Sequence, residues 1–250
     1  MSESREAALA RLRPWVERAR TFSGWDLSDV EPRLLEPGPP WDYEQLARKV
    51  LRDASSVLDI GTGGGEVLSG LVTARARFVA TEQWDVNAPV AAHRLCPLGV
   101  EVIHAQSLRL PFGEESFDII LSRHEEMDCA QVAAMLKPGG TVLTQQVGSD
   151  LWIEVCDYFP RWVVVEGIFE SYVEALRTAG LEVDARQHRY KVAYRSLGEL
   201  VYLLALTPWQ LPDLNLERDL DALLSLEAGL ATPDGLVVTE SRDLIVARKL

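Results

Sequence analysis

The residue pattern best suited to bind a ligand is a glycine-rich turn within Asp59-Ile60-Gly61-Thr62-Gly63-Gly64-Gly65-Glu66. An apolar run from Val57 to Ile60 leads into this turn, and helix-forming residues follow it. Glycine suits positions where the backbone adopts a positive φ or where a ligand lies against the main chain. Free N–H groups at the start of the next helix would then face that ligand. The pattern predicts a strand, a tight turn and a helix around a binding site.

The carboxylates that flank this turn distinguish between two kinds of nucleotide ligand. Dinucleotide-binding turns carry G-x-G-x-x-G and place the diphosphate at the helix N-terminus. That pattern would need a glycine at position 66, where this chain has Glu66. A carboxylate at a helix start repels a diphosphate, but it tolerates a ligand with sulfonium and ammonium groups. The turn therefore favours a cationic nucleoside over a nicotinamide dinucleotide.

The order Asp59-x-Gly61-x-Gly63-x-Gly65 resembles the first motif of the class I S-adenosylmethionine-dependent methyltransferases. Later segments match further landmarks of that family in the same order, namely Glu82, Gln106–Phe112, Phe117–Ile120 and Leu136–Gly140. The resemblance is strong over residues 44–147 and rests on element order alone over residues 168–250. It implies a Rossmann-like fold and S-adenosyl-L-methionine as cofactor.

The resemblance also implies roles for single residues. Glu82 stands where the family's acidic residue binds both ribose hydroxyls. Ser107 stands where the family usually has an aspartate that accepts the adenine amino group, and a hydroxyl accepts less strongly. The residues expected to contact the cofactor are Asp59, Gly61, Thr62, Gly63, Gly65, Glu82, Gln83, Gln106, Ser107, Leu108 and Arg123.

A charged run, Ser122–Glu126, offers candidates for the chemistry. Methyl transfer is an in-line displacement in which the protein mainly holds nucleophile and methyl group close and aligned, and a base is needed only where the nucleophile must lose a proton. The run follows the fourth expected strand, and ligands bind beyond the carboxyl ends of parallel strands. We expect His124 or Glu125 to face the acceptor as catalytic base or hydrogen-bond partner, and Arg123 to meet an acceptor carboxylate. Alternatively, His124 packs under its loop and the carboxylates are solvated.

Other polar residues admit two interpretations each. Gln145 and Gln146 end the fifth expected strand, where they would either bind a polar acceptor or hold their own loop. His188 lies among basic residues on the sixth, which would either meet an anionic acceptor or form the exposed side of an edge strand. The chain has three cysteines without paired spacing and no metal-ligand motif, which is typical of a reducing, cytoplasmic setting.

Apolar strands alternate with helical segments through most of the chain, which predicts a parallel sheet with helices on both faces. We expect a Rossmann-like, doubly wound, seven-stranded and mostly parallel sheet with an antiparallel terminal strand. The expected strands are 56–60, 78–82, 100–104, 117–121, 141–147, 181–195 and a terminal strand in two pieces, 236–239 and 244–247. The expected helices are 1–24 with a bend or break at Pro14, 42–51, 66–76, 86–95, 128–136, 168–179, 196–206 and 215–228.

Two segments lie outside this alternation. Residues 1–43 are expected to form an N-terminal helical or lid segment in front of a methyltransferase domain at 44–250. Residues 196–235 are longer than a simple connection between two strands, which predicts a cap-like insertion. Within it, Tyr202 and Trp209 would either line an apolar pocket or pack in the core.

The N-terminal segment carries aromatic residues with two possible roles. Trp25 and Trp41 flank a stretch rich in proline and glycine, which is too rich in breakers for a helix or strand. One interpretation is that both tryptophans pin this stretch to the rest of the chain. The other is that Trp41 or Tyr43 helps to cover a ligand at the glycine turn.

The composition narrows the choice of acceptor. The 250-residue chain has no apolar run of the ~20 residues that a membrane helix needs and no visible signal peptide. Its net charge of −13 opposes binding to phosphate backbones. We expect a small-molecule methyl acceptor, with neither nucleic acid nor membrane as partner. A methyltransferase acting on ribosomal or transfer RNA bases and a non-catalytic S-adenosylmethionine-binding protein are the alternatives.

Overall fold

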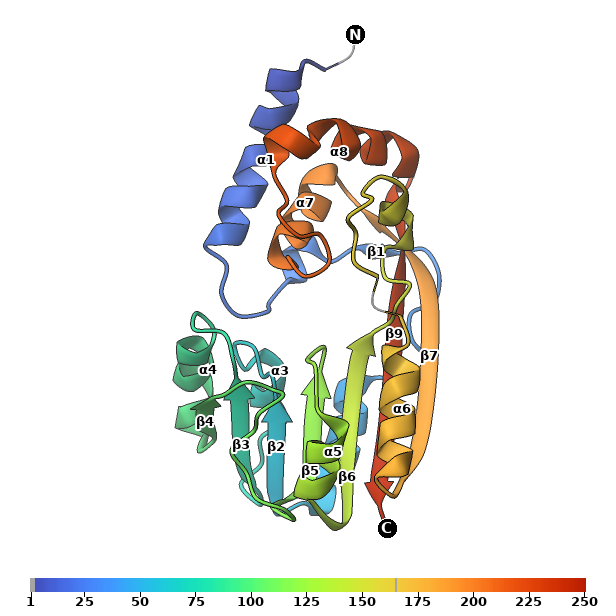
Figure 1. Cartoon of the computed structure of the whole chain (residues 1–250). Coiled ribbons are helices and arrows are strands. Elements are labelled where there is room, and N and C mark those ends of the chain that lie inside the picture. Colours follow the sequence, from blue (N-terminus) through green and yellow to red (C-terminus); the bar gives the residue numbers. More distant parts are fainter. Residues whose placement is uncertain (1–2, 165) are drawn as a thin grey trace.

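The structure, a computed structural model, describes residues 3–164 and 166–250. Figure 1 shows two regions, a sheet with flanking helices below and a group of helices above it. We call the lower region the sheet body. The upper region, called the cap, contains α1 (Arg5–Arg20), η4 (Ile153–Asp157), α7 (Leu197–Leu206) and α8 (Leu216–Leu230).

One mixed sheet runs through the molecule, with nine strands among the described residues. Its order is β1-β7-β9-β6-β5-β2-β3-β4, and β8 pairs with β9. Strands β2 to β6 pair in parallel, whereas β9 lies antiparallel between β6 and β7. The strands are β1 (Arg33–Leu34), β2 (Ser56–Ile60), β3 (Arg77–Glu82), β4 (Glu101–His104), β5 (Phe117–Arg123), β6 (Leu136–Val147), β7 (Leu181–Tyr194), β8 (Ala231–Thr232) and β9 (Gly235–Lys249).

The predicted fold class is confirmed. Seven of these strands correspond to the expected seven, and the antiparallel terminal strand is β9. The additional strands, β1 and β8, have two residues each. Strand β1 covers the edge of β7, so the basic residues around His188 lie one strand in from the edge over part of their length.

Two of the remaining helices, α2 (Tyr43–Val50) and α5 (Cys129–Met135), begin at a capping aspartate. Asp42 accepts a hydrogen bond from Gln45 N, and Asp128 accepts from Ala130 N and Gln131 N. Such caps satisfy amides that have no partner inside the helix. The helices of the sheet body are α2 (Tyr43–Val50), α3 (Glu66–Ser69), α4 (Ala88–Leu95), α5 (Cys129–Met135) and α6 (Ile168–Thr178), and the short 3₁₀ segments are η1 (Ser28–Val30), η2 (Leu51–Asp53) and η3 (Cys96–Leu98).

Several predicted elements differ from the structure. Strand β6 begins at Leu136 instead of residue 141, because Leu136 already pairs with Phe117 of β5. Helix α3 ends at Ser69 instead of residue 76, because Gly70 occupies its C-cap. Helix α1 is one continuous helix through Pro14, so the prediction of a break there is wrong. Strand β9 is one strand of 15 residues instead of two pieces, because the polar residues between the apolar runs stay paired with β7.

The sheet body buries apolar side chains on both faces. One cluster packs α5 and α6 against β5, with Ile120 and Leu176 fully buried. The other packs α2 and α4 against the opposite face, with Leu121 and Leu95 fully buried. Alternate residues of β5 therefore enter opposite clusters, as expected for a strand covered on both sides.

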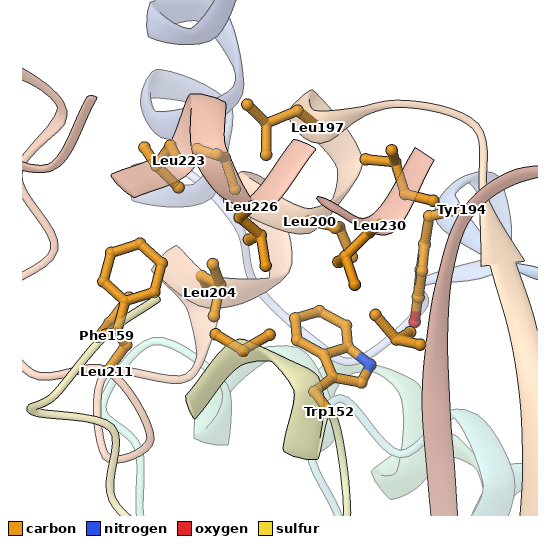
Figure 2. Close-up of a cluster of buried hydrophobic side chains, with 14 of the residues drawn as sticks. Trp152, Phe159, Tyr194, Leu197, Leu200, Leu204, Leu211, Leu223, Leu226 and Leu230 are labelled. Carbon is orange, nitrogen blue, oxygen red and sulfur yellow. The ribbon is translucent and has the colours of Figure 1, made fainter. Parts of the chain in front are cut away.

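The cap has its own apolar core. Figure 2 shows leucines of α7 and α8 gathered around Trp152, Phe159 and Tyr194. Helix α1 adds Leu12, and the upper ends of β7 and β9 add Val192 and Val238. Strands β7 and β9 thus belong to both regions, since they run from the sheet body into the cap (Figure 1).

Candidate functional site

The glycine turn, residues 61–65, follows β2 at the carboxyl edge of the parallel strands. Gly61, Gly63 and Gly65 have φ values of 67°, 63° and 79°, a region that residues with a side chain rarely adopt. Thr62 N donates to Thr81 O at 2.9 Å, which ties the turn to β3. A Cβ on Gly65 would lie 2.7 Å from Leu95 Cγ, so this glycine allows α4 to pack closely.

Side chains of the protein itself lie over the other two glycines. A Cβ on Gly61 would lie 2.5 Å from Glu125 Cβ and 2.7 Å from Glu125 Oε2. A Cβ on Gly63 would lie 2.5 Å from Trp25 Cδ1. The faces that glycine leaves bare are thus the ones that Glu125 and Trp25 cover. A ligand lying against the turn would have to take the place of one or both side chains.

Glu82 joins the end of β3 to the glycine turn. Its side chain is 2% exposed. Oε2 accepts from Gly63 N at 2.7 Å, and Oε1 accepts from Trp84 N at 2.8 Å. Burial raises the pKa of this carboxyl, and the two amide hydrogen bonds oppose that rise. The carboxylate lies beside the turn, where the predicted ribose contact requires it.

Glu125 turns inward at the end of β5. Gln83 Nε2 donates to its Oε1 at 3.0 Å, and the hydroxyl of the buried Ser107 also bonds its carboxylate. Burial, together with the charge of Glu82, raises the pKa of Glu125 to about 7. The structure thus brings together three predicted residues, Gln83, Ser107 and Glu125.

Asp59 adds a further acidic group next to the turn. It is half-buried on β2, and burial together with the charge of Glu82 raises its pKa to about 7. Asp59, Glu82 and Glu125 form no ion pair with a cationic side chain in the described part of the chain. The site is therefore electronegative and would be stabilised by a cation.

His124 and Glu125 face different neighbours. His124 has a φ of 62°, and its Nε2 lies 3.3 Å from Gln145 Nε2. His124 is exposed at the rim, yet the atoms packed around its ring and the guanidinium groups of Arg242 and Arg123 lower its pKa well below the ordinary value. The imidazole is neutral at pH 7, whereas Glu125 titrates near it. The two candidates are therefore separate groups and form no hydrogen-bonded pair.

A second side of the site is lined by residues on the α2 face. Trp41 Nε1 donates to Gln145 Oε1 at 2.9 Å, and Arg123 lies 5.9 Å from the centre of the Tyr43 ring. Gln146 Nε2 donates to Glu125 O at 2.8 Å. Both glutamines thus bond to residues of other segments, and neither bond holds the loop that follows β6.

Trp25 was expected at most to pin its own stretch to the rest of the chain, and its place over Gly63 was not predicted from the sequence. Gly24 N donates to Asn87 Oδ1 at 2.8 Å, and Trp25 N donates to Glu66 Oε1 at 3.3 Å, so this part of the N-terminal segment is fixed on the glycine turn. A Gly-Trp pair in an irregular stretch gives no periodic signal that would place it there. Trp41, by contrast, sits at the rim beside His188.

Two predicted adenine-side residues lie in the loop after β4. Gln106 and Leu108 are exposed, Leu108 at 44%. Ser107 between them is buried. The exposed side chains of Gln106 and Leu108 therefore lie on either side of Ser107, whose hydroxyl faces Glu125.

Glu66 forms an ion pair in the structure, which reduces the repulsion of a diphosphate expected from its charge. Arg94 Nη1 lies 2.9 Å from Glu66 Oε1, so the carboxylate is neutralised by an ion pair. Helix α3 has four residues, and its dipole is correspondingly short. Discrimination against a diphosphate therefore rests on Asp59, Glu82 and Glu125 instead.

The described residues contain neither a clustered set of metal-ligand side chains nor a membrane-spanning helix. Among residues 3–164 and 166–250, no group of three or more His, Cys, Asp or Glu side chains is arranged to hold a metal ion. In the same residues no helix combines the length and apolar character needed to cross a bilayer.

Comparison with known proteins supports the fold. The family model of the methyltransferase domain matches residues 58–144. No curated protein matches the chain. Among solved structures, a functionally unknown protein from Deinococcus radiodurans R1 is 16% identical, with a TM-score of 0.63 over 95% of this chain and 100% of that one.

Two other similar structures bear names with a chemical meaning. A candidate methyltransferase from Bacillus halodurans C-125 is 18% identical, with a TM-score of 0.56 over 81% of this chain and 98% of that one. The [4+2]-cyclase SpnF is 16% identical, with a TM-score of 0.51 over 96% of this chain and 93% of that one. At these identities the likeness shows the fold alone.

The sheet order, the glycine turn after β2 and the acidic residue ending β3 define the class of Rossmann-like nucleoside-binding folds. Within that class the chain has the class I methyltransferase fold and carries the methyltransferase domain at residues 58–144. The resemblance seen in the sequence is therefore confirmed.

Proposed function

We propose that this protein transfers a methyl group from S-adenosyl-L-methionine to a small-molecule acceptor. The observation that carries the proposal is the set of carboxylates Asp59, Glu82 and Glu125 around the glycine turn, none paired with a cation among the described residues. A sulfonium nucleoside supplies the missing positive charge, and a diphosphate would add negative charge. The match of residues 58–144 to the methyltransferase domain supports the same cofactor.

The proposed cofactor contacts follow from the positions described above. Glu82 would hold the ribose, and Gln83, Gln106, Ser107 and Leu108 would surround the adenine. Asp59, Gly61, Thr62, Gly63, Gly65 and Arg123 would line the methionine end. The cofactor supplies an activated methyl carbon, so the protein's own part is to bind, align and exclude water.

The proposed acceptor side lies around His124. A neutral imidazole can accept a proton from a hydroxyl or amine nucleophile, although its lowered pKa makes it a weak base. Arg123 has no carboxylate within ion-pair distance in the described part of the chain, so an acidic acceptor could pair with it. The net charge of −13 supports a small molecule over a nucleic acid.

We also propose that the N-terminal segment 1–43 and the segment 196–235 shield the acceptor from water. Helix α1 packs against α7, so the two segments form one structure. Trp209 of the cap meets Trp84, which follows Glu82 on the body side, with ring centres 5.9 Å apart. This contact places the cap loop beside the proposed cofactor residues.

Replacement of Glu82 tests the cofactor assignment. Titration calorimetry of the wild type with S-adenosylhomocysteine is expected to show binding, and Glu82→Ala is expected to weaken it by about 10–100-fold, as for loss of a charged hydrogen-bond partner. The matched control is Glu101→Ala. Glu101 is an exposed residue of β4 that forms an ion pair with Arg77 of β3, and its replacement is expected to keep wild-type affinity. Equal binding by Glu82→Ala contradicts the assignment, as does the absence of binding by every folded form of the chain.

Replacement of His124 tests the proposed base. With a labelled methyl donor and an acceptor found by screening small molecules, His124→Ala is expected to lower kcat by about 100-fold if the acceptor must lose a proton. Cofactor affinity, measured by the same calorimetry, should change little. Unchanged turnover in His124→Ala removes this residue as a base.

A further inference from the structure

The side chain of Glu125 lies where the glycine turn leaves its backbone bare. It covers Gly61, with Oε2 2.7 Å from the position that a Cβ would take. It also takes a hydrogen bond from Gln83 Nε2 at 3.0 Å and one from the hydroxyl of Ser107. Gly61, Gln83 and Ser107 are all residues proposed for the cofactor. Glu125 therefore uses the same surface and the same donors as the proposed ligand.

The turn that carries Glu125 explains why its side chain points inward. His124 adopts the left-handed region, which non-glycine residues enter rarely. The carbonyl of Glu125 accepts from Ser122 Oγ at 3.2 Å and from Gln146 Nε2 at 2.8 Å. These bonds hold the backbone only. The side chain can therefore rotate away without breaking the bonds that fix the turn.

The inward position is also one that a ligand could disturb. The carboxylate is half-buried without a cationic partner in the described residues, and Glu82 next to it carries the same charge. A carboxylate in such surroundings loses hydration that two hydrogen bonds restore only in part. Rotation toward solvent regains that hydration, which keeps the difference between the two positions small.

We propose that Glu125 is a specificity-determining residue of the cofactor site, because its side chain competes with the cofactor for the space over Gly61. This inference rests on the proposed function. Binding requires the side chain to leave, so the apparent affinity falls by the fraction of molecules in which the space is open. After displacement, the carboxylate of Glu125 remains close enough to attract the sulfonium of S-adenosylmethionine. The uncharged thioether of S-adenosylhomocysteine is not attracted in this way. Glu125 thus lowers the affinity for S-adenosylhomocysteine more than the affinity for S-adenosylmethionine.

Titration calorimetry with both nucleosides on the full chain tests this competition. Glu125→Ala removes the competing side chain, and its affinity for S-adenosylhomocysteine is expected to rise roughly tenfold over the wild type, as when two hydrogen bonds need not be broken. The gain for S-adenosylmethionine should be smaller, because that ligand also loses an attractive charge. Glu125→Gln keeps the size and can still accept from Gln83, so it should stay close to wild type for S-adenosylhomocysteine.

The neighbouring Glu126 provides the matched control, since it is exposed and carries the same charge. Glu126→Ala should leave both affinities unchanged. Thermal unfolding of every variant checks that the chain is folded. Affinity for S-adenosylhomocysteine that is equal to or weaker than wild type in folded Glu125→Ala overturns the inference.

Failure of the proposed function looks different from failure of the competition. If neither the wild type nor Glu125→Ala binds either nucleoside, both proposals fall together. If the wild type binds and Glu82→Ala does not, the proposed cofactor site is supported. The competition is then decided by one quantity, the affinity of Glu125→Ala for S-adenosylhomocysteine relative to that of the wild type. Binding by Glu125→Ala where the wild type shows none supports both.

Discussion

The sheet body and the cap treat buried charge in opposite ways. In the body, Asp59 and Glu125 are buried without a cationic partner among the described residues, and burial raises the pKa of each to about 7. In the cap, Asp219 is 4% exposed, yet Arg161 and Arg218 bind it at 2.5 Å and 3.0 Å. Despite burial, the hydrogen bonds from Arg218, Asn215 N and Arg161 lower its pKa. The cap thus pairs this buried carboxylate with two guanidinium groups, whereas the body leaves the carboxylates around the glycine turn unpaired where a ligand would bind.

The first prediction concerns the two apolar cores and carries the largest effect. Leu226→Ala in the cap and Leu143→Ala in the body each remove a fully buried side chain, which should lower the free energy of unfolding by about 2–5 kcal/mol. Because β7 and β9 belong to both regions, each variant should still unfold in one urea transition, followed by circular dichroism. Two separate transitions in either variant would mean that cap and body are independent.

The second prediction tests the ion pairs of the buried Asp219 in the cap. Asp219→Asn leaves Arg161 and Arg218 without their carboxylate and should cost about 1–3 kcal/mol of unfolding free energy at pH 7. Because the pKa of Asp219 is lowered by folding, this stabilisation is lost as pH falls through its native pKa. The cost should therefore shrink in acid, as measured by urea unfolding at several pH values. Asp221→Asn, at an exposed residue of α8, is the control.

The third prediction tests Asp59, a carboxyl group of the body that has no ion-pair partner among the described residues. The pKa of Asp59 is about 7 in the folded chain against 3.8 for an ordinary aspartate, so the native state holds its proton more tightly. Stability is then greatest below the ordinary pKa and falls as pH rises through about 7. Asp59→Asn removes this fall, so its melting temperature should exceed that of the wild type by a margin that grows with pH. A margin independent of pH would show that Asp59 does not titrate in this range.

The smallest effect is expected where the two regions touch at the surface. Trp84 and Trp209 are 37% and 49% exposed and meet edge to face. Trp209→Ala should lower the free energy of unfolding by no more than about 1 kcal/mol. Trp41→Ala, which removes a hydrogen bond to Gln145, serves as the comparison inside the body. A larger loss for Trp209→Ala than for Trp41→Ala would contradict this order.

The sheet body could be predicted from the sequence because its signals are local. The run from Val57 to Ile60 and the nearly unbroken apolar residues of β5 indicated buried parallel strands, and Asp42 and Asp128 indicated helix starts. Glu82 was placed correctly at the end of its strand. Each of these features depends on neighbours within a few positions of the chain.

The arrangement over the glycine turn could not be predicted because it depends on contacts between distant segments. Trp25 over Gly63 and Glu125 over Gly61 join residues far apart in the sequence, and no periodicity encodes such contacts. The ion pair between Glu66 and Arg94 likewise joins two helices. The continuity of β9 was missed for the same reason, since its polar middle is held by pairing with β7.

The shared strands limit how this molecule could be rebuilt. In β9 alternate side chains point to opposite faces, so deleting one residue between the body and the cap would turn Glu240 and Arg242 to the wrong side. No cut at one point of the chain would free the cap, because β7 and β9 would both have to be rejoined in register. Exchange of the cap between related proteins would therefore demand that at least these two strands be rejoined in matched register.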